Sequence, residues 1–329
     1  MIGEPARPGS AEALTLESIR EAHERIRPYV HRTPVITCAS LDREAGTSLF
    51  FKCENLQKTG AFKARGACNA VMALDEASAR LGVATHSSGN HAAALARAAA
   101  LRGIPAHVVM PENSLPNKIA AVRAYGGMVT LCEATLEARE SAAERIVAST
   151  GAVLIHPYDD PRIIAGQGTA AVEFLEQVPD LDVLMTPVGG GGLLAGTLIA
   201  AKASAAHIRV VAGEPALADD AFRSWRCGSI QQPERTDTVA DGLRTALGNH
   251  TFPIIRDRVD DILLASEEAI LRATRMIMQF AKTVVEPSAA VPLAALLENA
   301  PGLTNQRVGI ILSGGNLDLG RLELVRKTC

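Results

Sequence analysis

The chain has 329 residues, 47% of them hydrophobic and 21% charged, and its formal net charge is −3. This length and composition are typical of a globular protein that buries a sizeable core and is long enough for two domains. It has no basic tract that would suggest nucleic acid binding, no apolar stretch long enough to span a membrane and no N-terminal export signal. Its six cysteines form no C-x-x-C pair, which favours reduced thiols over disulfides or a zinc site. We therefore expect a cytoplasmic protein without a structural metal cluster.

Short apolar runs alternate with alanine-rich amphipathic stretches, a pattern typical of βαβ units and a largely parallel sheet. The first helix is predicted over residues 16–26, with Thr15 as its N-cap and Pro28 just beyond its end. Another is predicted to begin after Ser266 and to run to about Lys282. Strands are predicted at 48–54, 82–86, 106–110, 128–132, 153–156, 183–186, 209–213, 261–265 and 308–312. The pattern predicts an α/β fold.

Four consecutive glycines, Gly189 to Gly192, lie between the apolar run 183–188 and the helix-like stretch 193–201. A turn without Cβ atoms, placed after a buried strand and before a helix, presents free N–H groups and a positive helix end to an anion. A flexible linker is the alternative, but linkers mix glycine with serine, proline and charged residues and are not flanked by apolar segments. The run matches neither G-x-G-x-x-G nor the P-loop pattern. We interpret it as a phosphate-binding turn for another kind of ligand.

Three other segments place reactive or donor groups at the ends of predicted strands, where ligands bind in open α/β sheets. Lys63 precedes an alanine-rich helix that is predicted to begin near Ala64, and an amine there is either solvated or covalently occupied. The segment 87–91 offers hydroxyl and N–H groups for a carboxylate, and Ser313 offers a hydroxyl for a ring nitrogen. Taken alone, these segments are better explained as a surface lysine, an N-cap and an ordinary turn. Together with the glycine turn they are the groups that pyridoxal phosphate needs to act on an amino acid.

With these motifs the chain resembles the fold-type II pyridoxal-phosphate enzymes, which are tryptophan synthase β-like, and within them the serine racemase and serine/threonine dehydratase group. The matching stretches follow the family's order and are 50–54, 58–67, 85–91, 164–169, 187–193, 240–242, 285–288 and 312–318. They cover nearly the whole chain from about residue 16. The resemblance implies two open, mostly parallel twisted sheets, a large coenzyme-binding domain of residues 1–72 and 160–329, and a small inserted mobile domain of residues 80–158.

The resemblance also implies the roles of individual residues. Lys63 would bind the coenzyme covalently, Phe62 would face its ring and Asn90 its phenolic oxygen. The remaining coenzyme contacts would be Gly189, Gly190, Gly191, Gly192 and Leu193 at the phosphate, Gly242, and Ser313 at the pyridine nitrogen. The substrate carboxylate would be held by Ser87, Ser88, Gly89 and His91.

Ser88 bears on the choice between two activities. In racemase-like members of the family a serine at this position faces the lysine across the substrate Cα, whereas members that only dehydrate often carry alanine. Two acid/base groups on opposite faces are the minimum for inversion at Cα. The resemblance thus implies an ammonia-lyase that converts L-serine or L-threonine to a 2-oxo acid, with serine racemase as a second activity.

Two alternatives stay open. The stretches 53–55, 156–158 and 286–291 are similar to those of the 3-hydroxyaspartate ammonia-lyases, which give oxaloacetate. A β-carboxylate substrate needs an additional cation, for which Arg139 and Arg244 are candidates, although each fits a solvated arginine equally well, and Tyr158 would lie near the substrate side chain. From another class, the chain could be an amino-acid or nucleotide sensor that kept the phosphate turn without catalysis.

Three further expectations come from the resemblance. Glu214, the carbonyl of Ala218 and Asp220 match a divalent-cation loop whose oxygen ligands suit Mg²⁺, Ca²⁺ or Mn²⁺. Lys58, Thr59 and Tyr125 match positions that bind ATP at a subunit interface in some relatives. The relatives also suggest a homodimer.

Overall fold

The computed structural model describes residues 14–87, 89–299, 302–318 and 320, which form two sheets flanked by helices. The larger sheet has the strand order β1-β2-β10-β7-β8-β9, and only β1 runs antiparallel to its neighbour. The smaller sheet, β5-β4-β3-β6, is parallel throughout. The strands are β1 Val35–Ile36, β2 Ser48–Lys52, β3 Val83–His86, β4 Ala106–Pro111, β5 Met128–Cys132, β6 Val153–Leu154, β7 Val183–Pro187, β8 Arg209–Pro215, β9 Asp261–Ala265 and β10 Arg307–Ile311. The predicted α/β class with two mostly parallel sheets is confirmed.

The helices lie between the strands, as the alternating pattern predicted. The α-helices are α1 Leu16–Ile26, α2 Ala39–Ala45, α3 Lys63–Met72, α4 Glu76–Arg80, α5 Asn90–Arg102, α6 Pro116–Ala124, α7 Leu136–Thr150, α8 Pro161–Gln177, α9 Gly192–Ser204, α10 Asp220–Cys227, α11 Thr251–Arg258, α12 Glu267–Met276 and α13 Pro287–Glu298. Shorter helical turns are η1 Glu54–Leu56, η2 Lys58–Gly60 and η3 Asp241–Leu243, with a π-helical turn η4 Ile277–Ala281. No helix in the described part of the chain is long and apolar enough to cross a membrane.

Several predicted ends differ from the structure for local reasons. The first helix has the predicted bounds, and the Thr15 side chain accepts a hydrogen bond from the N of Ser18. The helix predicted to reach Lys282 is α-helical only to Met276 and ends as the π-helical turn. Strand β1 was not predicted, because two residues are too few to show a period. Strand β6 is shorter than predicted, because the chain turns at His156, whose Nδ1 accepts from the N of Asp159 at 2.8 Å.

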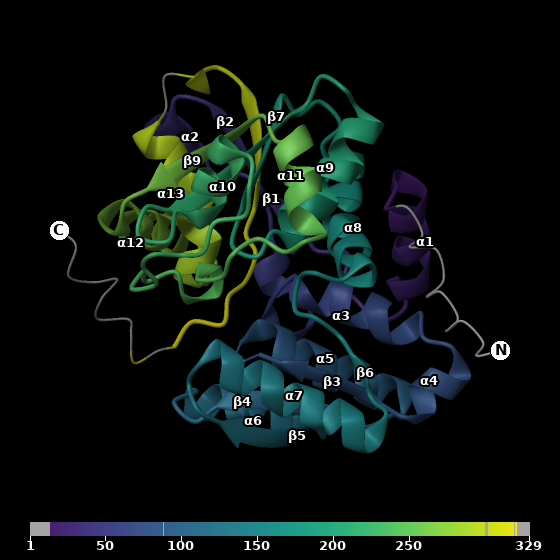
Figure 1. Ribbon diagram of the computed structural model, residues 1–329. Coiled ribbons are helices and arrows are strands. Elements are labelled where there is room, and N and C mark those ends of the chain that lie inside the picture. The colour runs from purple at the N-terminus through teal and green to yellow at the C-terminus, as the bar shows by residue number, and fades with distance from the viewer. Residues whose placement is uncertain (1–13, 88, 300–301, 319, 321–329) are drawn as a thin grey trace.

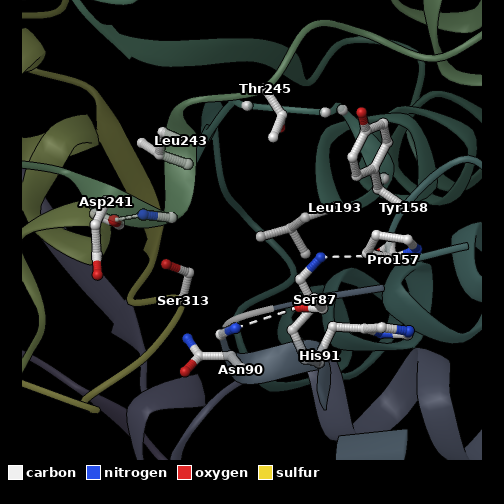
Figure 2. A pocket seen from close by; sticks show the side chains of 18 of the residues that line it. Ser87, Asn90, His91, Pro157, Tyr158, Leu193, Asp241, Leu243, Thr245 and Ser313 are labelled. Carbon is white, nitrogen blue, oxygen red and sulfur yellow. Dashed lines mark hydrogen bonds between the residues drawn. The ribbon is translucent and has the colours of Figure 1, made fainter. Parts of the chain in front are cut away.

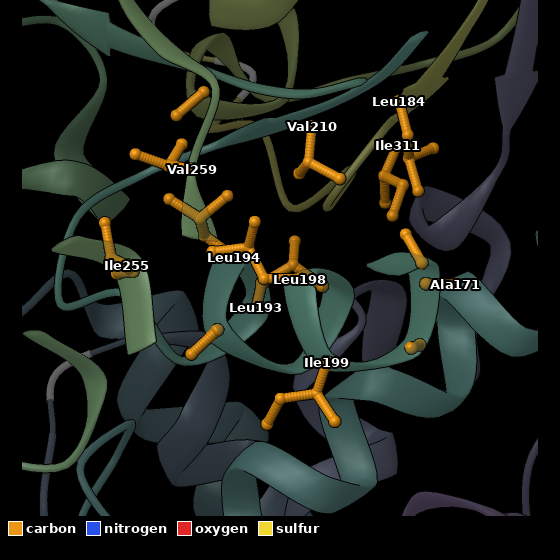
Figure 3. Packing of buried hydrophobic residues seen from close by; sticks show 14 of the residues in the cluster. Ala171, Leu184, Leu193, Leu194, Leu198, Ile199, Val210, Ile255, Val259 and Ile311 are labelled. Atoms are coloured by element: carbon orange, nitrogen blue, oxygen red, sulfur yellow. The ribbon is translucent and has the colours of Figure 1, made fainter. Parts of the chain in front are cut away.

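Helices cover both faces of the larger sheet (Figure 1), and an apolar layer fills the space on each face. Alternate residues of one strand point to opposite sides, so Leu184 packs in the cluster that includes α8, α9 and α11, and Met185 in the one that includes α2, α12 and α13. Figure 3 shows Leu194 and Leu198 of α9 packed beneath the sheet near Val210. Residues 192–201 of α9 are all buried, so the turn before this helix is anchored on a rigid core element.

Helix α3 lies between the two sheets and packs on α5 and α8 (Figure 1). It approaches α8 so closely that a Cβ on Gly66 would lie 2.3 Å from Nε2 of Gln167. In the first turn of α3, the fully buried guanidinium of Arg65 donates to Glu54 at 2.7 and 2.8 Å and to Glu173 at 2.9 and 2.8 Å. Removing one partner would leave a buried charge, at a cost of about 3–5 kcal/mol. This network fixes the start of α3, where Lys63 stands.

Candidate active site

A cavity of about 230 Å³ is lined by residues that follow the carboxyl ends of β3, β6, β7 and β10 (Figure 2). This is where ligands bind in open α/β sheets. The predicted site residues that line it are Phe62, Lys63, Ser87, Gly89, Asn90, His91, Arg139, Tyr158, Gly189, Gly190, Gly191, Gly192, Leu193, Gly242 and Ser313. Ser88 lies outside the described residues. Glu214, Ala218 and Asp220 do not line this cavity.

Lys63 is the first residue of α3 and reaches into the cavity. Its Nζ donates to the carbonyl oxygen of Pro157 at 2.7 Å and lies 5.1 Å from the centre of the Phe62 ring. Burial lowers the pKa of this amine to about 8, against the opposing effect of the Glu286 carboxylate. A lowered pKa makes the neutral, nucleophilic form of an amine accessible near physiological pH.

The glycine turn closes one side of the cavity. Gly191 has φ +87° and caps α9, whose first residue is Gly192. A Cβ on Gly189 would lie 2.9 Å from the Cα of Leu243, and a Cβ on Gly190 would lie 2.4 Å from three ring atoms of Tyr158. Side chains are therefore excluded from the turn, and its N–H groups at the positive end of a long buried helix are suited to a phosphate.

Asn90 and Ser313 lie on the side of the cavity near Glu286. Asn90 begins α5, and its Nδ2 donates to Oε1 of Glu286 at 2.8 Å. The carbonyl of Ser313 accepts from the N of Phe62 at 3.0 Å, which ties the end of β10 to the start of α3. Burial, and then the charge of Asp241, raise the pKa of Glu286 to about 7. A carboxyl group with this pKa can hold or release a proton near neutral pH.

The opposite end of the cavity carries histidines and Arg139. Burial, then the charges of His156 and Arg139, lower the pKa of His86 to about 4. His156 uses Nδ1 as an acceptor, so its neutral ring carries the proton on Nε2. Its ring meets those of His86 and Tyr158 edge-on at 5.6 and 4.5 Å between centroids. Half-buried Arg139 is thus the main cation at this end among the described lining residues.

The predicted carboxylate cradle lies beside the first turn of α5. The N of Gly89 donates to Oγ of Ser87 at 3.3 Å, as Figure 2 shows. Burial, followed by the charge of Lys63, holds the pKa of His91 well below its usual range, so its imidazole is neutral. A neutral histidine and N–H groups at a helix start can bind a carboxylate by hydrogen bonds.

A family model described as pyridoxal-phosphate dependent enzyme matches residues 26–314. The chain belongs to this family. Pyridoxal phosphate is therefore its cofactor, and the Lys63 amine beside the glycine turn fits that group.

The relatives of this pyridoxal-phosphate enzyme fall in the predicted subgroup. A serine racemase from Arabidopsis thaliana is 51% identical over 315 residues, covering 94% of this chain and 95% of its own. A beta-hydroxyaspartate dehydratase from Paracoccus denitrificans is 48% identical over 308 residues, covering 94% and 98%. The solved structure of maize serine racemase superposes with a TM-score of 0.92 at 49% identity, covering 95% and 96%. The resemblance inferred from the motifs is confirmed.

Some lining residues of the pyridoxal-phosphate enzyme were not predicted as site residues. These are His86, Leu136, Glu140, His156, Pro157, Pro187, Asp241, Leu243, Thr245, Glu286 and Ser288. A signal did exist for His86 and His156, because each stands at or just beyond the end of a predicted strand. Glu286 lies in the stretch 285–288, which matches the family, but no local sequence pattern indicates that its carboxyl group contacts Asn90.

The candidate cation loop is a separate cluster at the end of β8. Oε1 and Oε2 of Glu214 accept from the N atoms of Ala221 and Phe222 at 2.7 and 2.8 Å. Both carboxylate oxygens of Asp220 are buried without a hydrogen-bond partner among the described residues. Burial raises the pKa of both groups, that of Asp220 to about 7. The described residues contain no group of three or more His, Cys, Asp or Glu side chains arranged to hold a metal.

Proposed function

We propose that this pyridoxal-phosphate enzyme is an ammonia-lyase that removes water and ammonia from L-serine or L-threonine to give a 2-oxo acid, with serine racemase as a second activity. The observation that supports this most directly is the shared cavity of the Lys63 amine and the glycine turn. The 51% identity to a serine racemase supports the substrate class.

The residues present fit the coenzyme. The bare turn from Gly189 to Gly192 would hold its phosphate, and Leu193 would pack beside it; Phe62 would lie against its ring, with Gly242 near by. When bound, the coenzyme supplies an electron sink next to the substrate Cα. The Ser313 hydroxyl would meet the ring nitrogen, and a neutral partner there favours prompt elimination over a long-lived carbanion. Asn90, oriented by Glu286, would contact the phenolic oxygen.

The chain's own groups would then move the protons. Lys63, with its lowered pKa, would accept the Cα proton after the substrate carboxylate has bound to Ser87, Gly89 and His91. Ser88 would stand on the opposite face of Cα and return a proton there, which gives the other enantiomer.

A second candidate substrate is 3-hydroxyaspartate, and one observation favours it. Arg139 lines the cavity and is near enough to His86 for its charge to lower the pKa of that histidine, and a β-carboxylate could bind there. Arg244, the other candidate cation, donates to the carbonyl of Thr238 and does not line the cavity. The 48% identity to a beta-hydroxyaspartate dehydratase points the same way.

The test is made on the purified protein. We expect a visible absorption band that borohydride bleaches and that Lys63→Ala lacks, with 2-oxo acid release from L-serine and L-threonine. Release of oxaloacetate alone, from a 3-hydroxyaspartate isomer, would replace the proposed substrate with the second candidate. A protein that stays colourless with added pyridoxal phosphate would be a sensor.

We also propose that Glu214, the Ala218 carbonyl and Asp220 bind Mg²⁺, Ca²⁺ or Mn²⁺. Glu214 and Asp220 are two buried carboxyl groups that repel each other, and Asp220 has no hydrogen-bond partner among the described residues, so the pair needs either a proton or a cation. The mixed carboxylate and carbonyl oxygens suit a hard divalent ion.

We also propose that the protein is a homodimer with a small mobile domain. The homodimer is supported by two exposed apolar side chains, Leu56 and Val284. Their segments adjoin, because Nδ2 of Asn55 donates to the carbonyl of Val284, so the two side chains could contribute to one apolar contact surface. The strands of the small sheet all lie within the proposed mobile domain 80–158, and the large sheet is built from 1–72 and 160–329. ATP binding at Lys58, Thr59 and Tyr125 and a cytoplasmic location stand as the sequence predicted them.

A further inference from the structure

The carboxylate of Asp159 is held by backbone N–H groups from the start of α11. Its Oδ1 accepts from the N atoms of His250 at 2.7 Å and Thr251 at 3.3 Å, and its Oδ2 accepts from the N of Asn249 at 2.9 Å. The contact is tight, because a Cβ on Gly248 would lie 2.1 Å from Cγ of Asp159. Charge-assisted bonds at the positive end of a helix are among the stronger hydrogen bonds in proteins.

The same start of α11 is bonded to the glycine turn. Oγ1 of Thr251 donates to the carbonyl oxygen of Gly190 at 2.9 Å and accepts from the N of Gly248 at 2.8 Å. Asp159 and Gly190 are thus joined through one residue, Thr251, which contacts both. A displacement of α11 would move the carbonyl of the proposed phosphate turn.

The residues just before Asp159 face the cavity (Figure 2). The N of Asp159 donates to Nδ1 of His156, which closes the turn 156–159. Within this turn the carbonyl of Pro157 accepts from Lys63 Nζ at 2.7 Å, and the ring of Tyr158 lies against Gly190. The turn therefore touches both the amine and the phosphate turn.

We propose that Asp159 is a positioning residue of the coenzyme site. By binding the start of α11 it fixes the turn 156–159 against the glycine turn, so that the Lys63 amine and the phosphate-binding N–H groups keep a constant separation. The inference rests on the proposed function, because it assigns a role at the same site.

The neighbouring Asp160 does not share this role. Its carboxylate caps α8, accepting from the N of Arg162 at 2.8 Å and from the Arg162 guanidinium. Neither carboxylate lines the cavity itself. The two adjacent carboxylates therefore hold the chain at two different helix starts, and only the one that Asp159 binds is bonded in turn, through Thr251, to the glycine turn.

The test compares Asp159→Asn with wild type in coenzyme-free protein. Asparagine has nearly the same shape as aspartate but carries no charge. Its NH₂ group would also face a backbone N–H group that now donates to the carboxylate, so that hydrogen bond would be lost. We expect the Kd values for pyridoxal phosphate, followed by absorption, and for inorganic phosphate, followed by calorimetry, each to rise about tenfold. Asp257→Asn is the matched control. Asp257 lies in α11, the helix that Asp159 contacts, but it is exposed and pairs with Arg256, so this variant should bind both ligands with wild-type Kd values.

The outcomes separate positioning from stability. A purely structural role would lower the melting temperature and leave both Kd values unchanged well below melting, which would overturn the inference. If Asp159→Asn does not fold, Thr251→Val replaces it; this variant removes the bond to Gly190 and should weaken phosphate binding, and an unchanged phosphate Kd would overturn the inference equally. A wild-type protein that binds neither ligand would overturn the proposed function as well.

Discussion

Nζ of Lys63 lies 2.7 Å from the carbonyl oxygen of Pro157, 94 positions further along the chain. Lys63 opens α3, and Pro157 follows the edge strand β6 of the small sheet, so the contact joins the two parts of the molecule that border the cavity. An amine in this position is removed from water, which accounts for the lowered pKa. The first predictions concern the surroundings of this amine.

Gly190→Ala should weaken coenzyme binding, because its Cβ would lie 2.4 Å from the ring of Tyr158. Such overpacking costs about 1–3 kcal/mol, which corresponds to an about 5- to 150-fold higher Kd for pyridoxal phosphate by absorption titration. The double variant Gly190→Ala with Tyr158→Ala should regain part of the loss. Gly302→Ala is the control, since a Cβ there meets no atom within 4 Å. An unchanged Kd in Gly190→Ala would show that the turn does not hold the phosphate.

Glu286 should make the stability of the coenzyme-free protein depend on pH. The pKa of its carboxyl group is raised from 4.5 to about 7 in the folded state, so the folded state binds more protons between these values. The contribution of this group to the free energy of unfolding is fully present below about pH 4.5. It is lost as the pH rises through 7, and the total loss is up to about 3 kcal/mol. Denaturant titrations of wild type and Glu286→Gln at pH 5 and 7.5 should show a larger loss in wild type. Equal losses would contradict this assignment.

Arg139→Met should discriminate between the two substrate classes. If Arg139 binds a β-carboxylate, kcat/KM for 3-hydroxyaspartate should fall by about 10- to 100-fold, whereas the value for L-serine, which has no second carboxylate, should change less than about threefold. Arg145→Met tests the same substitution on the exposed face of α7, where Arg145 contacts Ser141. Parallel losses for both substrates would indicate that Arg139 acts in general positioning.

Ser88→Ala should abolish the exchange of L- and D-serine while most 2-oxo acid release from L-serine persists, because only inversion needs an acid/base group on the second face of Cα. Chiral analysis of serine and a 2-oxo acid assay on the same samples measure both. Ser87→Ala is the comparison, since Ser87 would bind the substrate carboxylate and its loss should raise KM for both reactions. If Ser88→Ala loses both activities equally, Ser88 positions substrate only.

The parts of the site that were predicted from the sequence are those with a local signal. The glycine turn is recognisable because its flanking strand and helix are contiguous with it, and Lys63 because it opens a helix within a known motif. Glu286 and Asp159 were missed because their roles depend on partners far away in the chain, Asn90 and the start of α11. The buried network of Lys52, Glu54, Arg65 and Glu173 was missed for the same reason, since charged residues are read as exposed until their partners are known.

Mg²⁺ should stabilise the protein through the Asp220 cluster. A cation that binds only the folded state adds about 2.7 kcal/mol at 100 times its Kd, which a thermal melt with MgCl₂ against chelator detects as a higher melting temperature. Asp220→Asn should remove this response and should also raise the melting temperature in chelator, because it takes away a buried carboxylate that has no hydrogen-bond partner in the described part of the chain. Asp219→Asn is the control, since the Asp219 carboxylate pairs with Arg223 instead, and the Mg²⁺ response should survive there. If the wild-type melting temperature is the same in Mg²⁺, Ca²⁺, Mn²⁺ and chelator, the proposed cation site is wrong. The two buried carboxyl groups would then be neutralised by bound protons and not by a cation.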